Sequence, residues 1–331
     1  MGLANWHRSA LIAAALATVA IAPALARDTV AEGSFDRTLK VSGAVDLTVE
    51  TGSGGITVRT GDGSSVHVIG KIRVNSDWHI DDKNAQDKVH RLESNPPIDQ
   101  NGNTITIGDI HDEDLKRNIS ISYELVVPAD TRLRSSTGSG SQELDGVKGP
   151  VEATTGSGSL RISHIGAELR ASTGSGTITL DTIQGAVRAN TGSGSIRADN
   201  VGGGITAQTG SGNIEYSQTA AGDVDVQTGS GRIELRGVHG RLSARAASGS
   251  IEAEGSPTGD WRLHSGSGGV TLRLPADAGF ELDASTGSGG LSTSHELTVS
   301  GTMSRRELRG KAHGGGPLIS VSTGSGSVRV E

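Results

Sequence analysis

Apolar and polar residues alternate with a period of two over much of the chain, most regularly in residues 131–331. In the segment 173–190 (TGSGTITLDTIQGAVRAN), apolar residues twice lie two positions apart: Ile178 with Leu180, and Val187 with Ala189. This alternation is typical of strands that bury one face and expose the other to solvent. The segment therefore predicts two short strands and two turns. No stretch of residues 131–331 has the apolar stripe of an amphipathic helix.

The segment repeats along the chain, and the tetrapeptide Thr-Gly-Ser-Gly marks each copy. Copies begin at positions 51, 137, 155, 173, 191, 209, 228, 286 and 323, and the variants AASG and SGSG begin at 246 and 265. From 137 to 209 the spacing is 18 residues four times in succession. A fixed period indicates a solenoid, in which each coil stacks on the last and matching positions meet. We therefore predict an all-β fold, a parallel β-solenoid (β-helix) of two-strand coils; the alternative is a β-sandwich or prism of stacked hairpins.

The N-terminal part is less regular. Alternation predicts strands within 34–50, 55–59, 66–74, 104–107 and 119–127. The only segment with helical character is 83–93 (KNAQDKVHRLE), which Asn95-Pro96-Pro97 would end. We divide the rest of the chain into an irregular region of β coils and a cap at 27–130, with an insertion at 75–100, and a TGSG-repeat solenoid at 131–331.

Residues 1–26 have the features of a secretory signal peptide. His7 and Arg8 precede an apolar run, Pro23 breaks it, and Ala24-Leu25-Ala26 supplies the small residues that signal peptidase requires. A membrane anchor is the alternative, but the run is shorter than the ~20 residues needed to span a bilayer. We expect export to the periplasm, the medium or the cell surface, with a mature N-terminus at Arg27 and no membrane-spanning segment.

Composition and charge exclude several classes of protein. Gly numbers 50, aromatic residues make up 2% and the chain has no cysteine, so we expect no aromatic-rich core, disulfide, thiolate metal site or cysteine nucleophile. The formal charge of −7, with both signs interspersed, argues against a nucleic-acid partner. At the TGSG corners we expect glycine for two reasons: it adopts positive φ at no steric cost, and it lets stacked backbones approach closely.

Five segments outside the simple repeat make the chain resemble a bacterial family of adhesin-like β-strand-repeat proteins of unknown function. They are 41–47 (VSGAVDL), 95–98 (NPPI), 101–105 (NGNTI), 122–128 (SYELVVP) and 314–319 (GGGPLI). The resemblance spans about residues 34–331. It implies an exported envelope or surface protein built of β-solenoid coils, and it brings no catalytic residues with it.

The motifs that carry chemistry are mostly missing. No TGSG is followed by the Lys-Ser/Thr of a phosphate-binding loop, no serine lies in G-x-S-x-G, and the glycine-rich turns lack the aspartates of calcium-binding repeats. Two acidic clusters could hold a cation, although solvated loops are the simpler interpretation: Asp109, Asp112, Glu113 and Asp114 with His111, and Asp81 and Asp82 with His79. Five further histidines share no repeat position: His164, His239, His264, His295 and His313. We expect no catalytic, cofactor-binding or metal-binding residue.

Two functions remain open. The first is a non-catalytic cell-envelope or surface solenoid, an adhesin or scaffold that binds a glycan or a protein partner. The second is a carbohydrate-active β-helix enzyme, a lyase or hydrolase, which would need paired acids. No clear row is expected from the acids that could serve, which are Asp181, Asp199, Glu215, Asp223, Asp225 and Glu234. A third possibility is ice binding by a ladder of Thr137, Thr155, Thr173, Thr191 and Thr209, but this ladder has one column where ice binders usually have two.

Overall fold

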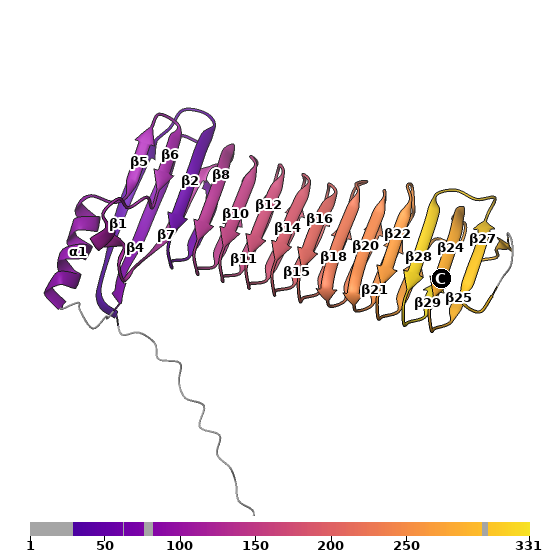
Figure 1. The fold of residues 1–331 in the computed structure, drawn as a ribbon. Helices are drawn as coiled ribbons and strands as arrows, with labels where there is room; N and C mark the ends of the chain where they lie inside the picture. Colours follow the sequence, from indigo (N-terminus) through magenta and orange to yellow (C-terminus); the bar gives the residue numbers. More distant parts are fainter. Residues whose placement is uncertain (1–28, 62, 76–81, 300–303) are drawn as a thin grey trace, which may run out of the picture.

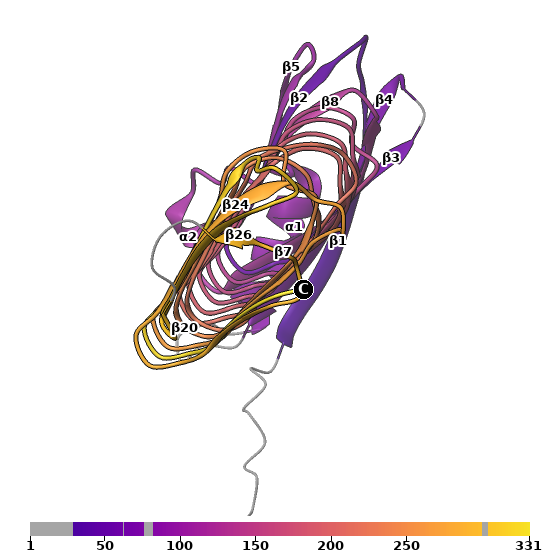
Figure 2. The same ribbon diagram turned by 90° about the vertical axis from the view of Figure 1, so that its right-hand side faces the viewer.

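The computed structural model describes residues 29–61, 63–75, 82–299 and 304–331. Within them the chain winds into a long, flat solenoid whose coils are stacked like the rungs of a ladder (Figure 1). Seen nearly along the axis, the coils superpose as flattened rings with a sheet on each broad side (Figure 2). The two sheets, called A and B below, have 14 and 15 strands among these residues. The signal-peptide prediction for 1–26 concerns residues outside the described part of the chain.

The central coils each contribute one strand to each sheet. In sheet A these strands are β9 (Gln142–Asp145), β11 (Leu160–Ile165), β13 (Ile178–Ile183), β15 (Ile196–Val201), β17 (Ile214–Gln218), β19 (Ile233–Val238), β21 (Ile251–Gly255) and β23 (Val270–Arg273). In sheet B they are β8 (Thr131–Thr137), β10 (Val151–Thr155), β12 (Leu169–Thr173), β14 (Val187–Thr191), β16 (Ile205–Thr209), β18 (Val224–Ser230), β20 (Leu242–Ser248) and β22 (Trp261–Ser265).

Neighbouring strands pair in parallel with equivalent residues of successive coils opposite one another. Leu160 lies beside Ile178, and Ile178 beside Ile196, so 18 residues make one coil. The predicted parallel solenoid of two-strand coils is therefore confirmed. The hairpin-stack alternative is wrong, because hairpins would pair these strands antiparallel.

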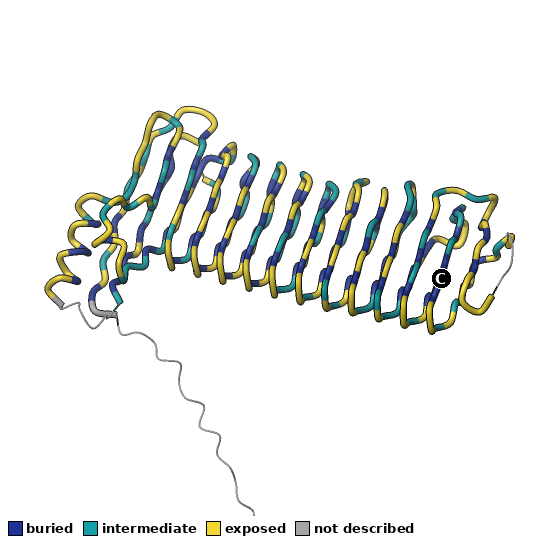
Figure 3. Tube along the Cα trace, in the orientation of Figure 1, coloured by how far each residue is buried: buried dark blue, intermediate teal, exposed yellow. Residues whose placement is uncertain are grey.

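The core is a thin layer between the two sheets, filled by rows of identical or similar side chains. Buried and exposed residues alternate along the strands (Figure 3). Sheet A contributes rows of Ile and Leu, while sheet B alternates a row of larger residues with a row of alanines, including Ala153, Ala171, Ala189 and Ala207. So thin a core needs few large aromatic side chains, which explains how a chain with 2% aromatic residues can still bury a continuous apolar interior.

The threonine of each TGSG corner points into the solenoid. Thr173 is 6% exposed, its Oγ1 donates to the carbonyl of Gly158 in the preceding coil at 2.8 Å, and it accepts from the amide of Gly176 at 3.1 Å. The same pair of bonds recurs at Thr155 and Thr191. The proposed ice-binding ladder is therefore wrong, because these hydroxyls are buried and already paired.

Close approach, rather than positive φ, explains the corner glycines. Gly174 and Gly176 have no positive φ, but a methyl group on either would overlap the carbonyl oxygen of its counterpart in the preceding coil, Gly156 or Gly158. The expectation of positive φ at this corner is therefore wrong for these residues. Left-handed backbone occurs instead just before the opposite corner, at the next-to-last residues of β11, β13 and β15: His164 (φ 54°), Thr182 (φ 55°) and Asn200 (φ 57°).

The order of coils at the N-terminal end differs from the order of the sequence. β2 (Val45–Thr51) and β3 (Ile56–Gly61) pair with β8 and β9. Their other neighbours come later in the chain: β6 (Thr104–Ile107) lies beside β2, and β7 (Ile119–Pro128) beside β3. The helix α2 (Glu113–Lys116) lies in the connection between β6 and β7. The first coil is therefore enclosed between two coils made by later residues.

Antiparallel strands and a helix complete the N-terminal end. Sheet B ends with β5 (Ile98–Asn101), and sheet A with β4 (Ser65–Asn75) and then β1 (Thr29–Lys40). The helix α1 (Asp82–Ser94) packs beside β1 at this end of the molecule (Figure 1), where Glu93 accepts from the amide of Ser34 at 3.0 Å. The predicted helix over 83–93 is confirmed to within one residue at each end.

The C-terminal end repeats this enclosed arrangement. The chain forms β24 (Phe280–Thr286), β25 (Leu291–Thr293), β26 (Thr298–Val299) and β27 (Glu307–Ala312) before it returns as β28 (Leu318–Thr323) and β29 (Val328–Val330). β28 lies between β22 and β24, and β29 between β23 and β25. The last coil in the sequence, β28 with β29, is thus the next to last in space. The coil of β24 and β25 lies outside it, followed in sheet B by β27 and then β26.

Candidate binding surface

The exposed face of sheet B carries a column of uncharged polar side chains parallel to the solenoid axis. Each residue comes immediately before the threonine of a TGSG copy, so the parallel pairing places them side by side on successive strands. We call this set the polar column; it consists of Ser136, Thr154, Ser172, Asn190, Gln208 and Gln227. Parallel strands are about 4.8 Å apart, so the column presents a hydroxyl or amide at each such step.

A shallow groove of about 490 Å³ runs beside the polar column. Its lining includes the outward residues from Thr154 to Gln227 and the corner glycines Gly174, Gly192 and Gly210. The corner glycines have no side chains, so they leave the hollow open next to the column. Hydroxyl and amide side chains both donate and accept hydrogen bonds, which suits a polymer rich in hydroxyl or amide groups. This surface was not predicted from the sequence, although its signal was there: an uncharged polar residue before six TGSG copies in succession.

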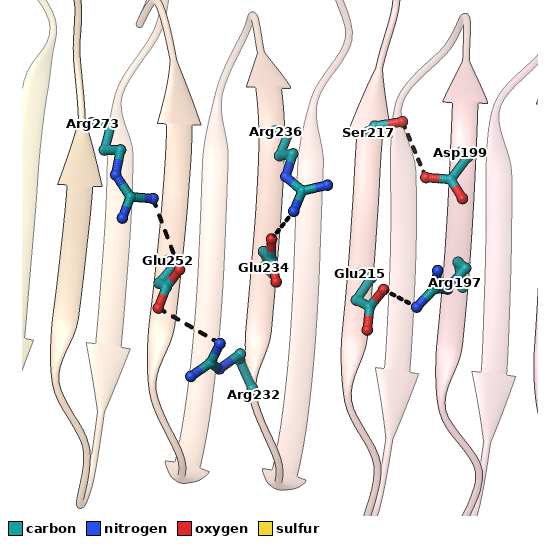
Figure 4. A network of polar contacts seen from close by, with 9 residues as sticks. All are labelled: Arg197, Asp199, Glu215, Ser217, Arg232, Glu234, Arg236, Glu252 and Arg273. Carbon is teal, nitrogen blue, oxygen red and sulfur yellow. Dashed lines mark hydrogen bonds and ion pairs between the residues drawn. The ribbon is translucent and has the colours of Figure 1, made fainter.

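Sheet A presents a different face, on which acids do form rows. Glu215, Glu234 and Glu252 occupy adjacent strands in register (Figure 4). The expectation that the acids form no row is therefore wrong for Glu215 and Glu234, and also for Asp181 and Asp199, which lie opposite each other. Asp223 and Asp225 belong to the sheet B side of the coil. Arginines meet every member of this row: Arg197 pairs with Glu215, Arg236 with Glu234, and Arg232 and Arg273 with Glu252 at 3.8 Å each.

A second acidic row on sheet A is tied up in hydrogen bonds between coils. Asp181 and Asp199 lie opposite each other in the parallel pairing. Asn200 Nδ2 donates to Asp181 at 2.9 Å, and Ser217 Oγ donates to Asp199 at 3.4 Å (Figure 4 shows the second bond). In both rows the carboxylates pair with nearby side chains on the outer face of the sheet. Ion pairs and hydrogen bonds between neighbouring coils therefore explain why these acids are there.

A small polar cluster lies beside the left-handed residue His164 and consists of Asp145, Ser163 and His164. Ser163 Oγ and His164 Nδ1 contact the same Asp145 oxygen, at 2.6 Å and 2.8 Å. The bond from Ser163, followed by that from His164, lowers the pKa of Asp145, and the bond to Asp145 with its charge raises the pKa of His164. Activation of a serine needs the histidine as the base that contacts the hydroxyl, whereas here both groups contact the aspartate. The arrangement supports an ion pair between coils rather than a nucleophile.

The acidic loop at 109–114 is organised by capping and ion pairs. Asp112 is the N-cap of α2 and accepts from the amides of Asp114 and Leu115. A side-chain bond from Arg91, at 2.6 Å, is the main cause of its lowered pKa. Glu113 pairs with Lys116 at 3.2 Å, and His111 lies 3.6 Å from Asp109. Of the other cluster, His79, Asp81 and the Asp82 side chain lie outside the described residues.

The described residues contain no group of three or more His, Asp or Glu side chains placed to hold a metal ion. In the same part of the chain, no helix is long and apolar enough to cross a membrane. The histidines noted in the sequence are dispersed: His264 contacts Ser322 at 2.8 Å, His313 contacts the carbonyl of Ala276 at 2.9 Å, and His295 stacks edge-on against Phe280.

Comparison with known protein families shows which family the chain belongs to. The sequence profile of Toastrack DUF4097 matches residues 46–331, which is most of the chain. The chain belongs to this family. The resemblance to a β-strand-repeat family of unknown function is thereby confirmed, and the two-sheet solenoid described above is the fold of this toastrack protein.

Three solved structures resemble the toastrack chain weakly. A candidate cell adhesion protein from Clostridium sporogenes is 12% identical, with a TM-score of 0.21, covering 91% of this chain and 99% of that one. A candidate lipid-binding protein from Parabacteroides distasonis is 13% identical (TM-score 0.37; 90% and 96% covered), and a candidate adhesin from Bacteroides fragilis is 13% identical (TM-score 0.24; 90% and 97% covered). Similarities this low say nothing about function. No curated protein matches the chain.

Proposed function

We propose that this toastrack protein is an exported, non-catalytic solenoid of the cell envelope or surface that binds a linear glycan along the groove on sheet B. The polar column carries the proposal. Six hydroxyl and amide side chains stand in a line on the sheet, one per coil, beside a hollow whose lining includes the corner glycines. A ligand with a repeating polar unit can meet several of these positions at once, so weak individual contacts add up through avidity.

A glycan fits this surface better than the apolar face of a folded protein. Stable protein interfaces are centred on large apolar or aromatic anchors. The exposed large hydrophobic residues of the described chain are Val126, Val299 and Leu318, and none of them belongs to the polar column. Sheet A is the poorer candidate because its acids are already paired with arginines.

Binding to a panel of linear polysaccharides, measured by calorimetry with the mature protein, tests this function. The double variant Asn190→Ala/Gln208→Ala should weaken binding about 30-fold, because it removes two amides that each contribute about 1 kcal/mol through hydrogen bonds. Thr179→Ala is the matched control, since Thr179 faces outward on sheet A. Equal binding by the wild type and the double variant would mean that the groove is not the site. If the protein binds no polysaccharide but does bind another protein, its partner is a protein and not a glycan.

The non-catalytic part of the proposal has its own test. Incubation of the purified protein with the same polysaccharides should release no new reducing ends or unsaturated products. Turnover that is lost in Glu234→Gln or Asp181→Asn would support the enzyme alternative, because these residues belong to the two acidic rows on sheet A.

Export is the third part of the proposal and rests on the pattern of residues 1–26. Mass spectrometry of the protein from its natural source should find a mature N-terminus at Arg27. Recovery of the intact leader in a membrane fraction would contradict it.

A further inference from the structure

Two arginines stand side by side on the exposed face of sheet B, in the column of outward positions next to the polar column. Arg170 on β12 lies opposite Arg188 on β14 in the parallel pairing. Both residues are exposed. Like charges placed directly opposite on neighbouring strands are destabilising. The solenoid therefore carries a local cost here, within a chain whose formal charge is −7.

Arg188 differs from the other arginines of its column in its ion pairs. Elsewhere in the same column, Arg134 pairs with Asp46 at 3.5 Å, Arg262 with Asp260 at 3.4 Å, and Arg309 with Asp283 at 3.1 Å. Arg170 has one acidic partner, Glu168, at 3.5 Å. Arg188 has none among the residues that the structure describes. Glu152 lies opposite Arg170 on the neighbouring strand, so acids flank Arg170 while, within the described chain, Arg188 presents an exposed guanidinium without an ion pair.

The two arginines border a hollow of about 340 Å³ whose lining also includes Glu168, Thr206 and the corner residue Gly204. Asp223, which borders it too, is engaged by Arg241 at 2.9 Å. Ser172 and Asn190 follow Arg170 and Arg188 by two positions on the same strands, so they face the same side of the sheet. Guanidinium groups and uncharged hydrogen-bonding groups therefore run in parallel along adjacent coils.

We propose that the ligand of this surface is an acidic polysaccharide whose sugar carboxylates bind Arg188 and Arg170. The inference rests on the proposed function and adds the charge of the ligand to it. A planar guanidinium binds a carboxylate through two parallel hydrogen bonds, which suits a uronate better than a neutral sugar. The ligand supplies the ion-pair partner that Arg188 lacks among the described residues, while its hydroxyls meet the polar column.

The test compares two polymers with the same backbone. Polygalacturonate carries a carboxylate on each sugar, and its fully methyl-esterified form carries none. We expect polygalacturonate to bind more tightly, with an affinity that falls as salt is raised, because exposed charges are screened. Arg188→Gln should weaken its binding about 3- to 10-fold, Arg170→Gln somewhat less, and neither should change binding of the ester.

Arg161→Gln is the matched control. Arg161 is exposed on sheet A, has no acidic partner among the described residues, and its loss changes the net charge by the same amount. Equal weakening by Arg161→Gln and Arg188→Gln would overturn the inference, because it would show only general attraction to a polyanion. Glu168→Gln, which frees Arg170, should strengthen binding about twofold. Thermal melts should show every variant folded. Arg188→Gln and Arg170→Gln should melt at or slightly above the wild-type temperature, since each removes the like-charge pair.

The outcomes separate this inference from the function on which it rests. If both polymers bind equally, and Asn190→Ala/Gln208→Ala weakens both while Arg188→Gln weakens neither, the glycan groove stands and the acidic ligand is wrong. If neither polymer binds, both proposals fail for this class of backbone. Tighter binding of the ester would also overturn the acidic ligand.

Discussion

The threonine of each TGSG corner satisfies two backbone groups that the tight turn would otherwise leave unpaired. Thr173 serves the carbonyl of Gly158 in one coil and the amide of Gly176 in its own. A buried backbone group without a partner costs about 1–3 kcal/mol. The glycines on either side of the serine let the coils approach closely enough for these bonds to form. The motif therefore stacks the coils, and its threonine hydroxyl is already fully engaged with backbone groups.

The glycine after the threonine gives a sharp prediction at this scale. Gly174→Ala should destabilise the protein by about 1–3 kcal/mol, because its methyl group would overlap the Gly156 carbonyl and force the two coils apart. Gly52→Ala should stay within about 0.5 kcal/mol of the wild type, since nothing lies within 4 Å of a methyl group there. Urea denaturation measures both. Equal effects at the two positions would contradict the close-approach explanation.

The ion pair between His164 and Asp145 predicts a pH dependence. The pKa of His164 is raised, so its contribution is complete below about pH 6.5, the unfolded value, and is lost as pH rises through the folded value. The pKa of Asp145 is lowered, so its contribution is present above about pH 4 and is lost on acidification. NMR titration of the His164 imidazole should give a pKa above 6.5, and Asp145→Asn should lower it. No change in that variant would contradict the pairing.

At the scale of the element, the unit of this fold is the two-strand coil rather than the single strand. Each strand of the central coils pairs with its equivalents one coil away in either direction, as Ile178 does with Leu160 and Ile196. Stability in such arrays is close to a sum of the units and the interfaces between neighbours. A whole coil should therefore be removable, whereas half a coil should not.

Deleting residues 173–190 tests this. Ser172 would then precede Thr191, and Ile162 would meet Ala198 where it now meets Leu180, so every other row stays in register. We expect a folded protein with one cooperative melt and a stability lower by about one coil's share. Deleting only 182–190 would leave Leu169 and Ala171 without their partners on β14, and we expect it to unfold. Circular dichroism of both variants decides; similar behaviour would contradict the two-strand coil.

At the scale of the whole molecule, neither end of the solenoid is built in sequence order. The coil of β2 and β3 is enclosed by β6 and β7, and the coil of β28 and β29 by β24 and β25. A strand at the end of a sheet offers unpaired backbone groups to other molecules. The strands left at the C-terminal edges are short, three residues in β25 and two in β26, which limits that hazard.

Truncation at residue 317 tests the role of the enclosed C-terminal coil. Loss of β28 and β29 would separate β22 from β24 and leave facing edges with no strand between them. We expect a larger loss of stability than from deleting residues 173–190, together with association visible by size-exclusion chromatography. A synthetic peptide of residues 318–331 should restore the monomer by filling the gap. A truncated protein that stays monomeric and melts like the wild type would contradict this.

The sequence by itself determined the repeating coil of this protein: period-two alternation and the 18-residue register specify two strands and the rows in which Leu160, Ile178 and Ile196 stack. It also determined α1, since Asn95-Pro96-Pro97 ends a polar segment between strands. Only the tertiary structure decided that the Thr173 hydroxyl is buried, that β28 enters between β22 and β24, and that Arg188 has no ion-pair partner among the described residues. The physical reason is that a periodic pattern states which positions are equivalent. The period does not specify which segment fills a gap between coils or which charged side chains pair, because both depend on contacts between coils.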